Sequence, residues 1–285
     1  MINHLCVIGV GLIGGSLSLA LKKTGYVKKV TGLGRSVTNL QKAEQLGIID
    51  HYETDYGKAI SHADMIFVAV PIGSMPEVFK KIEPHLKKHC IVTDGGSAKH
   101  TVIEMAADAF GLKLNQFVPG HPIAGTEKSG AEAAFDSLYQ KRRVIITPLE
   151  ENAADDVSRV KDMWKQAGAE VDEMGARHHD LVLAGTSHLP HVLAFALVDC
   201  LNNVDDVDEI FKYAAGGFRD FTRIASSDPK MWRDICIHNS DAILAMMNNY
   251  QQDMNHLKSA IQNSDGDELL KIFNKAKQAR DDFCM

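Results

Sequence analysis

The chain has 285 residues, of which 45% are hydrophobic and 24% are charged. This length and balance are typical of a soluble globular protein and leave room for two domains. The formal net charge of −6 gives no electrostatic reason to expect nucleic acid or an anionic membrane as a partner, although local arginines can still attract small acidic molecules.

The N-terminal segment predicts a strand, a glycine turn and a helix, in that order. The turn carries Gly9, Gly11 and Gly14 in the spacing G-x-G-x-x-G. In this context the pattern predicts a dinucleotide site: the first glycine permits the tight turn, the second admits the pyrophosphate, and the third lets the helix approach the strand. The start of the helix, with Leu12 and Ile13, then offers free N–H groups to the phosphates.

The same segment is apolar enough to resemble a signal peptide, but only His4 precedes it, so a positively charged n-region is missing. No other segment is expected to be long and apolar enough to span a bilayer. The five cysteines are far apart, odd in number and never spaced Cys-x-x-Cys, which predicts reduced thiols. We therefore expect a cytoplasmic protein with no membrane partner.

The second predicted strand, 30–34, is followed by Arg35 and Ser36 rather than by Asp or Glu. An acidic residue here would bind the ribose 2′-hydroxyl of NAD, whereas arginine and a hydroxyl suit the 2′-phosphate of NADP. The sequence therefore favours NADP over NAD, although an arginine that stacks on adenine would accept either cofactor. The next strand ends in Val70 and Pro71, which we also assign to the cofactor site.

Strands and helices continue to alternate as far as residue 174. Further strands are predicted over 64–71, 90–94, 117–119, 143–147 and 169–172, and helices over 76–86, 99–110 and 153–167. This alternation predicts an α/β fold, a Rossmann-type doubly wound sheet over residues 1–174. Beyond Gly175 the spacing of apolar residues predicts only helices, over 177–203, 205–215, 229–263 and 265–283. Residues 175–285 are therefore expected to form an all-helical second domain.

A histidine occupies a segment rich in glycine, GHPIAGTEKSG, over residues 120–130. Gly120 and Pro122 predict a stiff loop that keeps His121 out of regular structure. The loop follows a strand, so it is expected beyond the carboxyl ends of the sheet, where ligands bind in open α/β folds. His121 is therefore a candidate general base; spacing alone leaves a purely structural histidine equally open.

The helical half has a histidine pair of its own, His188 and His191, three residues apart on a helix that Pro190 is expected to kink. No acidic or cysteine ligand accompanies the pair at a convincing spacing, so no metal is predicted. The segment 177–180 (RHHD) is expected to be a solvated helix start.

Two arginines follow a glycine pair at 216–217, between predicted helices. Arg219 and Arg223 are candidates for a carboxylate clamp, since arginine binds carboxylates through two parallel hydrogen bonds. Pairing with Asp220 and Asp228 is the alternative, and it is more credible for Arg219 than for both.

Taken together, these segments resemble one enzyme family along essentially the whole chain. The sequence is similar to prephenate/arogenate dehydrogenases of tyrosine biosynthesis in five motifs that occur in the same order: GVGLIGGS (9–16), DGGSAK (94–99), GHPIAGTEKSG (120–130), SHLPH (187–191) and GGFRDFTRIASSDPKMW (216–232). The resemblance implies a Rossmann-type domain and a helical domain through which two chains dimerise. It also implies oxidation of prephenate to 4-hydroxyphenylpyruvate, with hydride transfer to NAD(P)+ and loss of carbon dioxide. Arogenate dehydrogenase and dual-specificity cyclohexadienyl dehydrogenase are the alternatives.

The resemblance assigns roles to residues. His121 matches the catalytic histidine that accepts the proton of the C4 hydroxyl, a task suited to an imidazole near its ordinary pKa of about 6.5. Ser97 matches the serine that hydrogen-bonds the same hydroxyl. Arg223 matches the arginine that binds a substrate carboxylate, and His191 a histidine that contacts the substrate side chain. The remaining expected pocket members are His188 and Glu127.

Two further expectations concern the ends of the chain and rival functions. No chorismate mutase segment precedes the glycine turn and helices are predicted to the end of the chain, so we expect a monofunctional enzyme in which any tyrosine inhibition acts at the active site. A hydroxyacid or imine reductase of similar build is disfavoured, because no matching catalytic lysine occurs between 175 and 200. A non-catalytic NADP sensor would not need His121, Ser97 and Arg223 together.

Overall fold

The computed structural model describes residues 1–205 and 207–284. It contains two compact units, Met1–Ser240 and Asp241–Met285. The predicted domain boundary after residue 174 falls between a strand that ends at Glu173 and a helix that begins at Ala176, and it stays a prediction.

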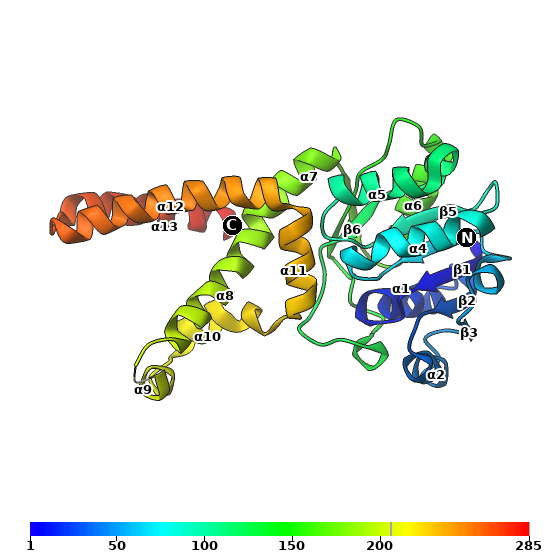
Figure 1. Ribbon diagram of the computed structural model, residues 1–285, viewed down its shortest axis with the longest axis horizontal. Helices are drawn as coiled ribbons and strands as arrows, with labels where there is room; N and C mark the ends of the chain where they lie inside the picture. Colours follow the sequence, from blue (N-terminus) through cyan, green and yellow to red (C-terminus); the bar gives the residue numbers. More distant parts are fainter. Residues whose placement is uncertain (206, 285) are drawn as a thin grey trace. The chain divides into compact units, whose positions relative to one another are not determined.

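The larger unit begins with a five-stranded parallel sheet in the order β3-β2-β1-β4-β5 (Figure 1). Its strands are β1 (Ile2–Ile8), β2 (Val27–Leu33), β3 (His51–Glu53), β4 (Met65–Val68) and β5 (Ile91–Asp94). All four residues of β4 and all four of β5 are buried, as expected for apolar strands covered on both faces. The strand order reverses between β1 and β4, so the crevice that binds ligands in such folds lies beyond the carboxyl ends of these two strands.

Helices form two layers against this sheet. Helix α1 contacts α6, whereas α4 contacts both α3 and α5. The bounds are α1 (Leu12–Lys23), α2 (Val37–Gln45), α3 (Tyr56–Ile60), α4 (Met75–Ile82), α5 (His100–Phe110) and α6 (Ala154–Gln166). Trp164 of α6 is fully buried and meets Phe67 of β4 edge to face at 5.4 Å. The α/β, doubly wound Rossmann-type fold is therefore confirmed.

A second, three-stranded sheet was not predicted. Its strands are β6 (Gly120–Pro122), β7 (Arg143–Ile146) and β8 (Glu170–Glu173), in the order β6-β7-β8. Strand β6 runs antiparallel to β7, so it cannot extend the parallel sheet in the predicted way. The strand predicted over 117–119 is reduced to a single bridge between Phe117 and Val92.

The rest of the larger unit is helical, as predicted, but two of the predicted helices are interrupted: one beside Pro190, where a kink was expected, and one at Asn239. The elements are α7 (Ala176–Leu183), a π-helical turn (Ala184–His188), α8 (Leu189–Asn202), α9 (Val207–Lys212), α10 (Gly216–Thr222), a 3-10 turn (Arg223–Ser226) and α11 (Pro229–His238). The helix predicted over 177–203 contains the π turn just before Pro190, which lacks the N–H that a regular helix would use there. The helix predicted over 229–263 is interrupted at Asn239, whose side chain binds elsewhere.

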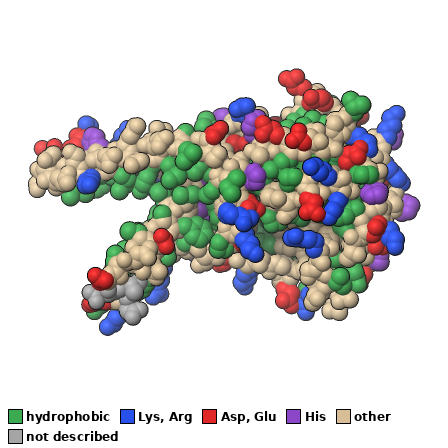
Figure 2. Space-filling model, in the orientation of Figure 1, with side chains coloured by type: hydrophobic (Ala, Val, Ile, Leu, Met, Phe, Trp, Pro, Cys, Tyr) green, Lys and Arg blue, Asp and Glu red, His purple; other side chains and the backbone are tan. Residues whose placement is uncertain are grey.

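The smaller unit consists of two helices, α12 (Ser240–Gln262) and α13 (Gly266–Cys284). They are connected by a short turn, and His256 of α12 hydrogen-bonds Glu268 of α13 at 3.2 Å. Large apolar side chains are exposed along both helices (Figure 2): Leu244, Met247, Tyr250, Met254, Ile261, Leu270 and Phe273. Such a surface indicates a contact with another chain.

One helical stretch in the described part of the chain is long and apolar enough to cross a membrane by length and composition. It spans Ala176–Asn202, with a mean hydropathy of 1.7 over its most apolar window, of which 22% is buried. The expectation that no such segment exists was therefore wrong on these criteria. The stretch joins α7, the π turn and α8, and one helix that meets these criteria is weak evidence for a membrane span.

Candidate active site

The glycine turn between β1 and α1 has the geometry of a phosphate cradle. Gly9 has a φ of +97°, and a Cβ on it would lie 2.4 Å from the carbonyl oxygen of Ala69. A Cβ on Gly14 would lie 2.3 Å from the Gly9 carbonyl oxygen, so α1 approaches the turn too closely for any side chain there. A Cβ on Gly11 meets no atom within 4 Å. The turn therefore has open space where a pyrophosphate would lie, beside an α1 N-terminus without a side-chain cap.

The residues assigned to the adenosine end of the cofactor surround the same turn. Arg35 and Ser36 are exposed after β2, and Ser36 caps α2 by accepting a hydrogen bond from the Asn39 N–H at 3.3 Å. An open groove of about 480 Å³ runs beside this cap, between α2 and residues 129–132. Val70 packs close to Gly9. These residues fit a dinucleotide.

A buried ion pair lies at the carboxyl end of β5. The Asp94 carboxylate and the Lys99 ammonium are both fully buried and 2.5 Å apart. Asp94 also accepts the N–H of Gly96 at 2.8 Å and the N–H of Gly120 at 3.0 Å, while Lys99 donates to the Gly120 carbonyl oxygen at 2.7 Å. The pair therefore ties the loop that carries Ser97 to the strand that carries His121.

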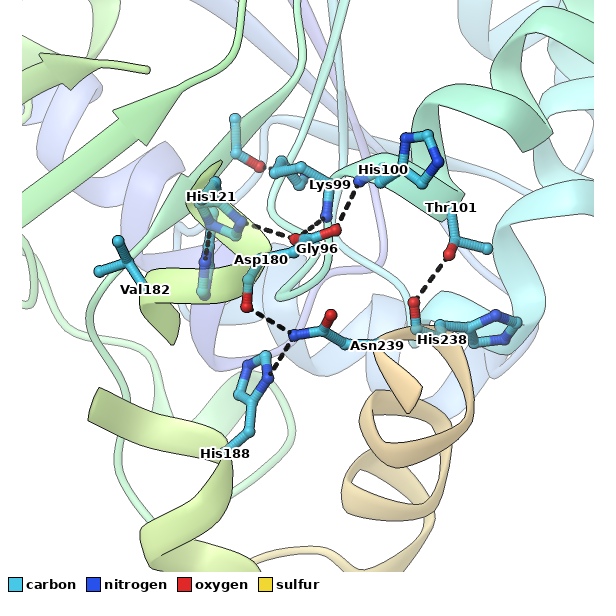
Figure 3. A network of polar contacts seen from close by, with 12 residues as sticks. Gly96, Lys99, His100, Thr101, His121, Asp180, Val182, His188, His238 and Asn239 are labelled. Carbon is cyan, nitrogen blue, oxygen red and sulfur yellow. Dashed lines mark hydrogen bonds and ion pairs between the residues drawn. The ribbon is translucent and has the colours of Figure 1, made fainter. Parts of the chain in front are cut away.

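His121 lies in β6 rather than in the predicted loop, because Asp94, Lys99 and the pairing with β7 hold this backbone extended. It is 8% exposed, and its Nδ1 lies 2.8 Å from Nε2 of His179. His179 Nδ1 in turn lies 2.8 Å from the Asp180 carboxylate. Figure 3 shows His121 and Asp180 close to each other beside Lys99. No hydrogen bond joins His121 Nε2 to any residue in the described ranges.

Two expectations about these residues were wrong. His179 and Asp180, expected in a solvated helix start, are 0% and 5% exposed, because α7 packs against α5. The pKa of His121 was expected near its ordinary value. Burial, with the neighbouring charges of His179, Lys99 and His188, lowers it well below 6.5. His121 is therefore a neutral proton acceptor at neutral pH.

The two histidines of SHLPH have different environments. His188 is 1% exposed, and its Nδ1 lies 3.0 Å from the side-chain nitrogen of Asn239, which also donates to the Asp180 carbonyl oxygen at 2.9 Å. Burial lowers the pKa of His188 to about 4. His191 is half-buried and stacks on Trp232 with ring centroids 3.8 Å apart. His188 is therefore held neutral beside the His179–Asp180 pair, whereas His191 is more open.

Arg223 and Glu127 lie at the solvent-exposed side of this group. Their charged atoms are 3.9 Å apart, with 65% and 49% of the side chains exposed. Burial, and to a smaller degree the positive charge of Arg223, lowers the pKa of His191. An open groove of about 470 Å³ runs between Glu127 and residues 226–230. The exposed pair is weak, so Arg223 remains available to an anionic ligand.

The structure thus brings most of the predicted site residues into one region. His121, His188, His191, Arg223 and Glu127 form a connected series of neighbours, and Ser97 lies half-buried in the loop that Asp94 ties to β6. No hydrogen bond of Ser97 is present within the described residues. Arg35 and Ser36 lie at the separate adenosine end. The individual roles of all these residues stay predictions.

Several residues at this site were missed from the sequence: Asp94, Lys99, His179, Asp180, Trp232 and Asn239. Asp94 and Lys99 lie inside a recognised motif, but nothing in the motif shows that they pair. His179 and Asp180 look like ordinary polar residues at the start of a helix, and only their burial distinguishes them.

Comparisons with known proteins agree on one family. A family model described as "Prephenate dehydrogenase, nucleotide-binding domain" matches residues 17–173, and one described as "Prephenate dehydrogenase, dimerization domain" matches residues 175–275. A cyclohexadienyl dehydrogenase from Zymomonas mobilis is 37% identical over 280 residues, which cover 98% of this chain and 95% of the relative. A prephenate dehydrogenase from Bacillus subtilis is 34% identical over 99% of this chain and 76% of its own. The crystal structure of prephenate dehydrogenase from A. aeolicus in complex with hydroxyphenyl propionate and NAD+ has a TM-score of 0.92 at 37% identity, covering 98% of both chains.

Proposed function

The chain belongs to the prephenate dehydrogenase family, and we propose that within this family its preferred reaction is the oxidative decarboxylation of prephenate to 4-hydroxyphenylpyruvate. As a member it is a nicotinamide-dependent oxidoreductase. The choice of substrate, the choice between NAD and NADP, and the role of each residue are the parts proposed here.

One observation carries the proposal: Nδ1 of His121 is held by a buried histidine, and its Nε2 has no hydrogen-bond partner among residues 1–205 and 207–284. A neutral imidazole fixed in this way is suited to accept a proton from a substrate hydroxyl. Its strand is tied by Asp94 to the loop of Ser97, at the edge of the sheet where ligands bind.

Each residue of the site has its own proposed role. His121 Nε2 accepts the proton of the C4 hydroxyl, and Ser97 hydrogen-bonds the same oxygen. Arg223 binds a substrate carboxylate in exchange for its weak contact with Glu127, which is how a protein with a net charge of −6 binds a dianion. His191, flat against Trp232, contacts the substrate side chain. The dinucleotide, whose pyrophosphate the turn of Gly9, Gly11 and Gly14 would hold, would supply an oxidised nicotinamide as the hydride acceptor.

The rate enhancement comes mainly from positioning the substrate and the dinucleotide and from one general base. Loss of the ring carboxylate as carbon dioxide restores aromaticity, so the reaction has its own driving force once the C4–H bond breaks. Holding the reacting groups in register contributes several kcal/mol in such reactions, and the backbone anchors from Asp94 and Lys99 support that register.

Arogenate is the second candidate substrate, favoured by the name of the Zymomonas mobilis relative, cyclohexadienyl dehydrogenase. For the cofactor, NADP is supported by Arg35 and Ser36, with no acidic residue directly after β2. Dimerisation through the helical part is supported by the exposed apolar faces of α12 and α13 and by the match to a dimerization domain. We also propose a cytoplasmic location, which the scattered cysteines support.

Initial rates with prephenate and with arogenate, each crossed with NAD+ and NADP+, test these proposals together. We expect the highest kcat/KM with prephenate and NADP+, and a loss of the NADP+ preference in Arg35→Ala. A higher kcat/KM with arogenate would transfer the assignment to arogenate dehydrogenase, and equal use of both would make the enzyme dual-specific. Light scattering of the purified protein checks the dimer, and a monomer at micromolar concentration would contradict it.

A further inference from the structure

We propose that His121, His179 and Asp180 form a proton relay, in which the proton that His121 takes from the substrate is matched by transfer of its other proton to His179. This inference rests on His121 being the base, as in the proposed function. His179 and Asp180 are positioning residues, since they act through His121.

Asp180 determines the direction of both hydrogen bonds in the series His121–His179–Asp180. Its carboxylate accepts the backbone N–H of Lys99 at 2.7 Å and that of His100 at 2.9 Å (Figure 3). Burial by itself raises the pKa of Asp180, but hydrogen bonds from His179 and from these two N–H groups outweigh it and lower the pKa. Asp180 is therefore an ionised acceptor, and His179 carries its proton on Nδ1.

The tautomer of His121 is then determined. With Nδ1 protonated, a neutral His179 has only a lone pair on Nε2, so at 2.8 Å it accepts a hydrogen bond from His121 Nδ1. The free lone pair of His121 is consequently on Nε2, the atom without a hydrogen-bond partner in the part of the chain that the structure describes. The buried carboxylate thus selects which nitrogen of His121 faces the substrate.

The charges around His121, His179 and Asp180 indicate which of the two histidines better stabilises an added proton. Lys99 and Asp94 neutralise each other as a buried pair. Asp180 has no lysine or arginine partner among the residues that the structure describes; its one salt-bridge contact is with His179. Burial and Lys99 lower the pKa of both histidines, but only His179 has a carboxylate 2.8 Å away, and the hydrogen bond and charge of Asp180 act in the opposite direction by raising its pKa. The added proton is therefore expected to be more stable on His179 than on His121.

The step balances without a further reactant. The substrate O–H bond breaks as the His121 Nε2–H bond forms, and the His121 Nδ1–H bond breaks as the His179 Nε2–H bond forms. His121 ends neutral, and His179 ends as an imidazolium hydrogen-bonded to the Asp180 carboxylate. The substrate hydride leaves to the nicotinamide as in the proposed function.

The test compares His179→Gln with His178→Gln, a matched control one residue earlier on the exposed side of α7. Glutamine can still accept a hydrogen bond from His121 but cannot take a proton. We expect His179→Gln to lower the single-turnover rate of nicotinamide reduction about 100-fold, with KM changed less than about twofold, and the control to match the wild type. The rate is also measured in mixtures of H2O and D2O and plotted against the fraction of D2O. The wild-type plot should be curved, as two transferred protons require, and the His179→Gln plot should be a straight line.

A rate for His179→Gln within about threefold of the wild type, or a two-proton curve in that variant, would overturn the relay. Nitrogen NMR of the wild-type holoenzyme tests the relay without a variant. It should show the proton of His121 on Nδ1 and the lone pair on Nε2. The opposite tautomer would also overturn the relay. If the wild type and His178→Gln turn over neither prephenate nor arogenate, it is the proposed function that fails.

Discussion

Replacing His121 with asparagine is expected to abolish most of the turnover while leaving the fold and the cofactor site intact. The strand of His121 is anchored through the backbone of Gly120, to Asp94 at 3.0 Å and to Lys99 at 2.7 Å, and these contacts do not involve the imidazole. The asparagine side-chain nitrogen can still donate toward His179, but no basic lone pair remains for the substrate. A positioned general base contributes about 10²- to 10⁴-fold, or about 3 to 5 kcal/mol of transition-state stabilisation.

The loss should appear in kcat, because His121 acts on the reacting hydroxyl rather than on the carboxylates that anchor the substrate. The assay is the initial rate of nicotinamide reduction with prephenate, together with cofactor affinity by fluorescence titration. His89→Asn, an exposed histidine outside the site, is the control. Turnover within about threefold of the wild type in His121→Asn would refute the assignment of the base, and a large loss of cofactor affinity would show that the change disturbed the fold instead.

Four further outcomes are expected. Because burial lowers the pKa of His121, the acid limb of kcat/KM should lie below pH 6.5, and a limb at or above that value would contradict a buried base. Burial of His188 lowers its pKa to about 4, from an ordinary 6.5; the unfolded chain binds the proton more readily, so stability is lost as pH falls between these values. In urea unfolding, the free energy of unfolding of the wild type should fall by on the order of 3 kcal/mol more than that of His188→Asn over that pH range. An equal fall in both proteins would count against this prediction. Gly14→Ala should destabilise the protein by about 1–3 kcal/mol in thermal or urea unfolding, since its Cβ would lie 2.3 Å from the Gly9 carbonyl oxygen. Gly11→Ala, whose Cβ meets nothing within 4 Å, should leave stability unchanged but weaken dinucleotide binding, and unchanged cofactor affinity would argue against the cradle.

The fold was largely predictable because its signals are local. Apolar β-branched runs become buried parallel strands, and the spacing Gly9, Gly11, Gly14 needs only a strand before it and a helix after it. The helical second half follows from apolar periodicity in the same way. The interruption of the helix predicted over 229–263 coincides with contacts that are distant in sequence: the Asn239 side chain donates to the Asp180 carbonyl oxygen and lies 3.0 Å from His188 Nδ1.

The active site was predictable in part for a related reason. His121, Ser97, His191 and Arg223 lie in recognisable motifs, so their types and order could be interpreted one motif at a time. His179 and Asp180 carry no such pattern. The surroundings of an ionisable group set its pKa. The lowered pKa of His121 could not be predicted from the sequence, because it depends on burial and on groups at the start of α5, in α7 and in the π turn.

The sequence by itself determined the Rossmann-type fold, the helical second half, the dinucleotide turn and the family, because each of these depends on residues close together in the chain. The tertiary structure decided which nitrogen of His121 is free, why that histidine is neutral, and which carboxylate controls it. Those properties depend on Asp94, Lys99 and Asp180, which only the packing of α5 and α7 and the pairing of β6 bring within hydrogen-bond distance of one another. Hydrogen bonds and desolvation act over a few ångströms in space, whatever the separation along the chain.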